Sequence, residues 1–186
     1  MKTHNGVPRD EAWFEAFFKT HHAKIRAYAL RRDPQAADDI VAQVFETAWR
    51  HRDRLPDHEL PWLYRTASNH LLHSFRDSTR HMAREARFEA VEFSSATTNP
   101  TEGIADRLDQ VELIESVLAE MSESDAELLK LWAWEQLEIV EIAQVVGCSA
   151  ATARVRLHRA RKRCEILLNQ KHAHTRAAEL SEQGMQ

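Results

Sequence analysis

The chain carries, at residues 138–163, the stretch EIVEIAQVVGCSAATARVRLHRARKR. The apolar residues of its first part recur at helical spacing: Ile139, Ile142, Ala143 and Val146. Gly147 can adopt the positive φ that ends such a helix, and Ser149 is a favourable N-cap for the next one. The stretch therefore predicts a helix, a tight turn and a second helix.

The second of these helices is strongly basic. A narrow inner stripe is expected at Ala153, Leu157, Ala160 and Cys164. The other faces are crowded by Arg154, Arg156, His158, Arg159, Arg161, Lys162 and Arg163. No acidic residue lies between Glu141 and Glu165, whereas a generic solvated face, the alternative interpretation, normally mixes both signs. The pattern indicates a helix-turn-helix whose second helix suits an anionic groove, because arginine binds base edges and phosphates.

The composition favours an all-α protein. The 186 residues are 43% hydrophobic and include only 4 glycines and 5 prolines. No apolar run approaches the length of a membrane span, and the first residues lack the apolar stretch of a signal peptide. We therefore expect a soluble, cytoplasmic protein without membrane contact of its own.

A formal net charge of -4 is unfavourable for nucleic-acid binding, but the charges are unevenly distributed. Between residues 91 and 150 the basic residues are Arg107 and Lys130, among 13 acidic ones. Beyond residue 151 the balance reverses. A protein can be acidic overall and still present one basic helix to DNA.

The chain is expected to form two small helical domains joined by a flexible linker. We predict a flexible N-terminus at 1–10, a first domain at 11–90, a linker at 91–108, a second domain with the helix-turn-helix at 109–170, and a polar tail, disordered or a frayed helix, at 171–186. Apolar spacing predicts three helices in the first domain, the third beginning near Pro61. In the second domain, Ser124 and Glu127 have the spacing of a capping box.

The cysteines and histidines form no recognisable metal site. Cys148 and Cys164 lack the spacing of a metal motif, so we expect buried free thiols. Histidines at i, i+3, such as His70 and His73, could bind zinc by spacing alone, which leaves a metal-binding or enzymatic helical bundle as a weak alternative. No paired nucleophile and base accompanies them, so neither catalytic residues nor a cofactor or metal is predicted.

Two separated blocks together resemble a bacterial RNA polymerase sigma factor of the extracytoplasmic function (ECF) type, group 4 of the sigma-70 family. The first block contains AADDIVAQVFETAWRHRDR (36–54) and PWLYRTASNHLLHSFR (61–76). The second is MSESDAELLKLWAWEQLEIVEIAQVVGCSAATARVRLHRARKR (121–163). The resemblance covers most of the chain, from Trp13 to Leu168. It implies that the first domain binds the polymerase and the −10 element, and that the second reads the −35 element.

The resemblance implies three sets of contact residues. Core polymerase would be bound by Asp38, Asp39, Gln43, Phe45 and Trp49, with core packing as the alternative for Phe45 and Trp49. The −10 element and strand opening would involve Trp62, Asn69, His73, Arg76 and Arg80, with core packing as the alternative for Trp62. The −35 element would be contacted by Thr152, Arg154, Val155, Arg156, His158, Arg159 and Lys162, of which Arg156 and Lys162 are expected at phosphate.

The chain departs from the family pattern at several positions. His73 stands where an acid is usual, Ser68 where arginine is common, and Gln136 where a glycine often precedes the second helix of the motif. Val155 replaces a small polar residue, which allows an apolar contact to a thymine methyl group. The connection between Arg52 and Pro61, which captures a flipped base in family members, is short.

The implied partners are core RNA polymerase, through its clamp helices and flap, promoter DNA, and an anti-sigma factor. The rival interpretation is a stand-alone helix-turn-helix repressor or activator with an N-terminal sensing or dimerisation domain. That interpretation explains the second block equally well. It leaves the basic, aromatic-bearing helix after Pro61 without a purpose.

Overall fold

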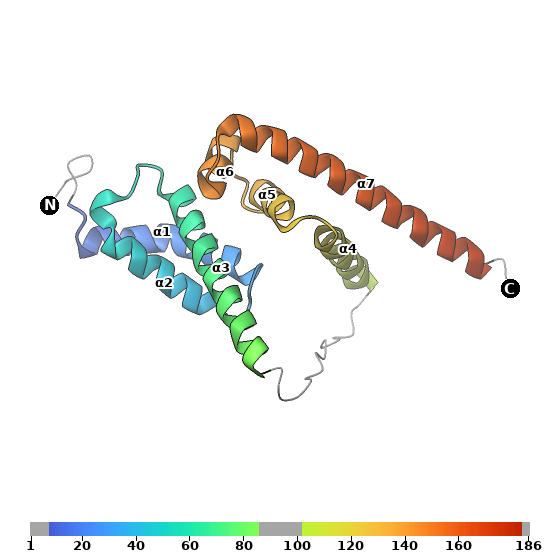
Figure 1. The fold of residues 1–186 in the computed structure, drawn as a ribbon, viewed down its shortest axis with the longest axis horizontal. Coiled ribbons are helices and arrows are strands. Elements are labelled where there is room, and N and C mark those ends of the chain that lie inside the picture. The colour runs from blue at the N-terminus through green and yellow to red at the C-terminus, as the bar shows by residue number, and fades with distance from the viewer. Residues whose placement is uncertain (1–7, 86–101, 184–186) are drawn as a thin grey trace. The chain divides into compact units, whose positions relative to one another are not determined.

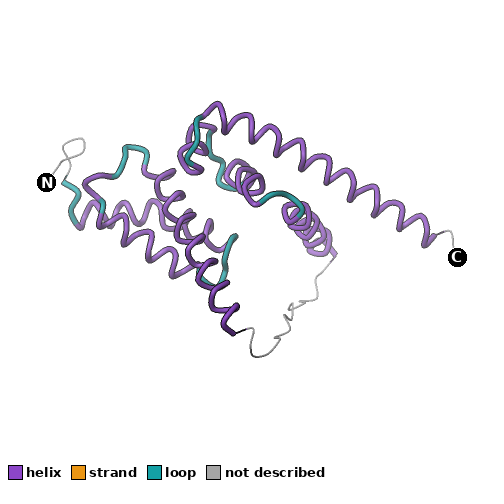
Figure 2. The backbone as a smooth tube through the Cα atoms, in the orientation of Figure 1, coloured by secondary structure: helices purple, strands orange, loops and turns teal. Residues whose placement is uncertain are grey.

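The structure is a computed structural model that describes the backbone of residues 8–85 and 102–183, and the side chains of residues 8–73 and 110–173. Every regular element in these ranges is a helix, which confirms the all-α prediction for the described part of the chain (Figure 2). By their contacts the helices form two compact units, one centred on α1–α3 and the other on α4, α5 and α7.

The first unit is a three-helix bundle of α1 (Glu11–Leu30), α2 (Ala37–Arg50) and α3 (Glu59–Glu85), with a 3-10 turn, η1 (Arg52–Arg54), between the last two (Figure 1). The predicted three helices are thus confirmed. Asp10 caps α1 by accepting a hydrogen bond from the backbone N–H of Trp13. Pro61 lies in the first turn of α3, where its missing N–H costs nothing. Tyr28 and Tyr64, with rings 5.0 Å apart, join α1 to α3 in the core.

An aromatic cluster joins α1 to α2. Phe45 of α2 is 3% exposed and lies against rings of Phe14, Phe17 and Phe18 from α1. Trp49, one turn further along α2, meets Phe14 edge-on with ring centroids 5.0 Å apart. Such pairs add to the free energy of burying the rings. The cluster holds the exposed side of α2 in a fixed orientation.

The second half of the chain forms α4 (Glu102–Ala119), α5 (Glu123–Ala133), α6 (Ile139–Val146) and α7 (Ala150–Gln183). Of α6, the part up to Ile142 belongs by its contacts to the second unit, together with α4, α5 and α7. Helix α7 packs against both α5 and α4, and Lys171 pairs with Glu120 at 2.6 Å. The buried side chains of this unit include Leu128 and Leu131 of α5 and Leu157 of α7.

The predicted capping box at the start of α5 is wrong. Ser122, not Ser124, occupies the N-cap, and its hydroxyl accepts a hydrogen bond from the N–H of Asp125. Because α5 begins at Glu123, Ser124 already lies in the first helical turn and is too far along to cap it. Two serines with an acid three residues later made the sequence pattern ambiguous.

The helix-turn-helix has the predicted local chemistry. Gly147 has φ = 74°, the left-handed conformation that ends α6. Two residues on, the Ser149 hydroxyl accepts a hydrogen bond of 3.1 Å from the N–H of Thr152 and so caps α7. Ala153, Leu157 and Ala160 are all buried, as expected for the inner stripe.

Two helices cross the predicted domain boundaries. Helix α4 begins at Glu102, within the predicted linker 91–108, and α7 continues to Gln183, within the predicted tail 171–186. The tail is therefore helical over most of its length. The rest of the predicted linker, 91–101, and most of the predicted N-terminal segment, 1–7, lie outside the described residues.

Candidate nucleic-acid and polymerase interface

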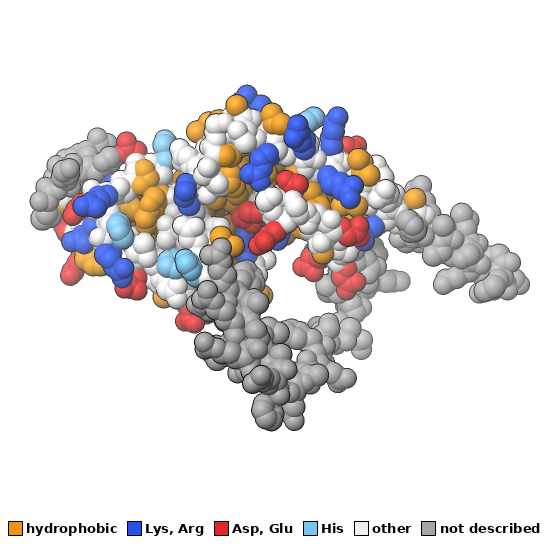
Figure 3. Space-filling model, viewed as in Figure 1, with side chains coloured by type: hydrophobic (Ala, Val, Ile, Leu, Met, Phe, Trp, Pro, Cys, Tyr) orange, Lys and Arg blue, Asp and Glu red, His pale blue; other side chains and the backbone are white. Residues whose placement is uncertain are grey.

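The outward face of α7 carries most of the residues predicted to read DNA. The exposed ones are Thr152, Arg154, Val155, His158, Arg159 and Lys162. Val155 keeps 50% of its surface exposed although it is apolar, and it lies one turn before Arg159. Figure 3 shows blue basic side chains gathered along this helix. A helix with this face and a capped N-terminus fits the major groove of DNA.

Thr152 and Arg161 also make contacts within the protein, and Arg156 is less exposed than the residues of the outward face. Arg156 is half-buried rather than exposed, so it lies at the edge of the outward face. The Thr152 hydroxyl lies 2.9 Å from that of Ser149 and belongs to the cap. Arg161 places its guanidinium carbon 4.5 Å from the centre of the Trp132 ring in α5, which ties α7 to α5.

Helix α2 presents an acidic and polar face. Asp38, Asp39 and Gln43 are exposed, and Asp38 pairs with Arg26 of α1 at 3.1 Å. Phase along the helix places them opposite the buried residues Ile40, Val41 and Val44. This surface is available for a partner.

The two aromatic residues assigned to the same face behave differently. Phe45 is part of the aromatic cluster and cannot reach a partner, so its assignment to polymerase binding is corrected to core packing. It points inward because it follows Val41 by one helical turn. Trp49 is half-buried and lies beneath the guanidinium of Arg52, 4.2 Å from the ring centre.

Helix α3 carries a single stripe of candidate strand-opening residues. Trp62, Asn69, His73, Arg76 and Arg80 are separated by seven, four, three and four residues, which at 3.6 residues per turn places them on one face. Trp62 is half-buried, and Asn69 and His73 are exposed. The side chains of Arg76 and Arg80 lie outside the described residues. One face therefore combines an aromatic ring, an amide and basic positions.

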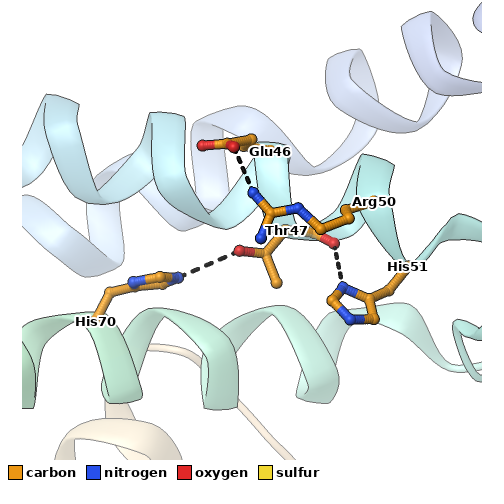
Figure 4. A network of polar contacts seen from close by, with 5 residues as sticks. All are labelled: Glu46, Thr47, Arg50, His51 and His70. Atoms are coloured by element: carbon orange, nitrogen blue, oxygen red, sulfur yellow. Dashed lines mark hydrogen bonds and ion pairs between the residues drawn. The ribbon is translucent and has the colours of Figure 1, made fainter.

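Beside this stripe, polar contacts link α2 to α3 and to the turn after α2 (Figure 4). The His70 ring nitrogen lies 3.5 Å from the Thr47 hydroxyl, and the His51 ring donates to the Thr47 carbonyl at 2.9 Å. Burial, and next the neighbouring His73, lower the pKa of His70, against a smaller opposing effect of Glu46. Glu46 itself pairs with Arg50 at 2.5 Å.

The structure offers no support for the metal-binding alternative within the residues whose side chains it describes, where no three histidine, cysteine or acidic residues converge. Cys148 and Cys164 are free thiols, but half-buried rather than buried. Partial burial raises the pKa of the Cys164 thiol, which favours its unreactive protonated form. Likewise, no helix within the described ranges has the length and apolar character needed to cross a membrane.

Sequence reasoning missed two residues near these surfaces. Arg9 is buried at the base of α1, although charge and position predicted a flexible segment. Gln136, just before α6, has φ = 55°, a left-handed conformation that L residues rarely adopt. For Gln136, the sequence signal was that the residue replaces a glycine of the family pattern. For Arg9, no local sequence pattern indicated burial.

A capped helix-turn-helix with a basic outer face, joined in one chain to a second helical unit, defines a DNA-binding protein. Two segments match known families: residues 17–81 match Sigma-70 region 2, and residues 112–164 match Sigma-70, region 4. The chain therefore belongs to the sigma-70 family of RNA polymerase sigma factors, in its ECF branch.

Several relatives support this placement. The ECF sigma factor SigL of Mycobacterium tuberculosis is 26% identical over 174 residues, 87% of this chain and 92% of the relative. The ECF sigma factor SigM of Bacillus subtilis is 24% identical over 142 residues, covering 76% and 85%. A probable sigma factor, RfaY, of Xanthomonas campestris is 33% identical over 141 residues, 73% of this chain, and the matched part is about a third of the relative.

Solved structures share the fold. The sigma factor RpoE from Bartonella quintana, crystallised with the anti-sigma factor NepR, has a TM-score of 0.61 at 20% identity and covers 84% of this chain and 96% of its own. CnrH, solved in complex with the cytosolic domain of CnrY, has a TM-score of 0.58 at 23% identity, covering 87% and 91%. At such identities the likeness concerns the fold.

Proposed function

We propose that this chain binds core RNA polymerase and directs it to promoters by reading a −35 and a −10 element and helping to melt the DNA. The observation that carries the proposal is the coexistence of two surfaces in one sigma-family chain: the basic outer face of α7 and the aromatic and polar stripe of α3. A simple repressor needs only the first. We assign no reaction to the protein itself, because the polymerase performs the chemistry.

The −35 element is assigned to α7. Arg159 and Arg154 can donate two hydrogen bonds to a guanine edge, and the exposed Val155 can contact a thymine methyl group. Lys162 and Arg156 serve as phosphate contacts, which fix the position of the helix without selecting a sequence. His158 and Thr152 lie on the same outward face and complete the contact surface.

Strand opening is assigned to α3. The half-buried Trp62 can stack on an unpaired base while its inner part stays packed, and Asn69 can hydrogen-bond to a base edge. His73 lacks the negative charge of the acid usual at its position, so it does not repel the DNA backbone. Arg76 and Arg80 continue the stripe and would hold the displaced strand.

Polymerase binding is assigned to the exposed face of α2. Asp38, Asp39 and Gln43 suit a basic partner surface such as the clamp helices, with the exposed edge of Trp49 alongside. The second unit would contact the flap. We further propose an anti-sigma partner, since RpoE and CnrH were each solved with a bound protein, and a cytoplasmic location, where polymerase and promoters are found.

Reconstitution with purified bacterial core polymerase tests the proposal. Run-off transcription from a genomic fragment library should yield discrete transcripts that depend on the protein. Their start sites would share two upstream elements. A protein that fails to bind core polymerase but shifts duplex DNA on its own would instead be a stand-alone helix-turn-helix regulator.

A further inference from the structure

The segment before α1 contains a buried charge. Arg9 is 4% exposed, the only Lys, Arg, Asp or Glu classed as buried among the described residues. Its Nη1 donates hydrogen bonds to the carbonyl oxygens of Arg52 and, at 3.2 Å, of Leu55. Its guanidinium carbon lies 5.1 Å from the centre of the Trp13 ring. Burying a charge is costly unless its surroundings satisfy it, so these contacts define a specific seat for the side chain.

Arg52 returns the interaction. Its Nε donates to the carbonyl oxygen of Arg9 at 3.1 Å, and its Nη1 donates to the carbonyl of Trp49 at 2.9 Å. Each arginine therefore holds the backbone of the other, 43 residues away in the chain. We call this reciprocal pair the Arg9–Arg52 clasp.

The clasp acts on the connection between α2 and α3. It bonds three backbone carbonyls there: those of Trp49 in the last turn of α2, Arg52 in η1, and Leu55 just after it. Leu55 is itself 3% exposed and anchors the connection in the core. Helix α3 begins four residues after Leu55, so the clasp holds the backbone that leads directly into the first turn of α3, where Trp62 lies.

We propose that Arg9 and Arg52 are positioning residues for promoter opening. The inference rests on the proposed function, in which α2 binds the polymerase and α3 receives the opened strand. A fixed connection holds Trp62 at the correct place relative to the polymerase-bound α2, so that base capture costs no further ordering of the turn. Arg9 lies outside residues 17–81 that match the family, so the proposal rests on the contacts that Arg9 makes in this chain.

The test measures promoter opening with full-length protein, core polymerase and a promoter identified by run-off transcription. Arg9→Gln removes the charge and the bridging geometry. We expect it to bind core polymerase within about twofold of wild type but to slow open-complex formation about tenfold, the effect of leaving buried carbonyls without their donor. As the control, Arg50→Gln removes an exposed arginine of α2 that pairs with Glu46, and this variant should open promoters normally.

Loss of stability is separated from loss of positioning by a matched core variant. Ile25→Val deletes one methylene from a fully buried residue of α1, away from the clasp, and should lower thermal stability comparably. If Ile25→Val slows opening as much as Arg9→Gln, or if Arg9→Gln opens promoters like wild type, the proposal is overturned while the proposed function stands. A wild-type protein without core-dependent transcription would overturn both.

The reciprocal contacts of the two arginines predict the rate of promoter opening in a double variant. Because each guanidinium holds the other's backbone, the double variant Arg9→Gln with Arg52→Gln should slow opening little more than the worse single variant. Fully additive slowing would show that the two arginines act independently and would contradict the clasp.

Discussion

The two helices proposed to contact DNA, α7 and α3, reach their orientation by different means. Helix α7 is set by residues next to it: Gly147 ends the preceding helix and Ser149 caps the next. The start of α3 depends on contacts between residues 43 positions apart, through Arg9 and Arg52. The first kind of site is visible in a short stretch of sequence, and the second becomes visible only when the chain is folded.

The largest expected effect is a loss of stability in the first unit when Phe45 is replaced. Phe45→Ala leaves a cavity under three rings of α1, and should lower the free energy of unfolding of the first unit by about 3–5 kcal/mol. Polymerase binding should fall with it, because α2 loses its support. Urea unfolding measures the change, with Val155→Ala, on the exposed face of α7, as the control expected to change stability by less than about 0.5 kcal/mol. Equal stability of the two variants would contradict the core assignment.

The next effect separates reading from anchoring on α7. Arg159→Ala should weaken promoter binding by about 1–3 kcal/mol and relax selection at one position of the −35 element. Lys162→Ala should weaken binding evenly across sequences and reduce the salt dependence by about one phosphate contact. Transcription from a promoter library at several salt concentrations measures both. Identical profiles for the two variants would refute the division of roles.

A smaller effect, this time an increase in the free energy of unfolding, is expected at the turn before α6. Gln136 has φ = 55°, which costs an L residue free energy that glycine does not pay. Gln136→Gly should therefore stabilise the protein by about 0.5–1 kcal/mol, after allowing for the greater freedom of glycine in the unfolded chain. Thermal unfolding measures the gain. Glu135→Gly, the neighbouring residue without a positive φ, should destabilise instead, and a loss at both positions would contradict the strain.

The pH dependence of stability sharpens the account of the α2–α3 contact. Because burial lowers the pKa of His70 below its usual 6.5, the unfolded chain takes up the proton first as the pH falls. Well above pH 6.5, protonation of His70 should not affect the free energy of unfolding. As the pH drops from 6.5 toward the pKa of His70 in the folded protein, the free energy of unfolding should decline. His70→Gln should flatten this decline. His21, whose pKa is also lowered by burial, accounts for a remaining slope.

An unchanged slope in His70→Gln would mean that the contact to Thr47 does not respond to protonation. His158→Gln, at an exposed position of α7, is the matched control. Unfolding curves between pH 5 and 8, the range in which histidine changes charge, provide the measurement.

Much of the fold could be predicted because the periodic apolar stripes are strong. The apolar positions of α2 and the inner stripe of α7 are buried as their spacing indicates, except that Cys164 in the α7 stripe is half-buried. Helix ends were less certain where two caps competed, as at Ser122 and Ser124. Helical spacing does not distinguish these serines, because both precede an acid by three residues.

The candidate site was predictable to the extent that exposure follows helical phase. The outward residues of α7 and the stripe of α3 follow this rule. The phase of Phe45, one turn after the buried Val41, indicates the core, whereas the resemblance marks the position without saying whether its side chain faces the partner or the core. Arg9 was unpredictable, since its binding partners are backbone carbonyls that carry no sequence signal.

The most direct measurement of the central claim is a footprint of the protein with core polymerase on one promoter, combined with permanganate probing of unpaired thymines. The account predicts that the two DNA-reading units protect two separate elements, about 35 and 10 base pairs upstream of the start. Reactive thymines should appear only at the element about 10 base pairs upstream. Protection of one palindromic site by the protein alone, with no unpaired thymines, would contradict it.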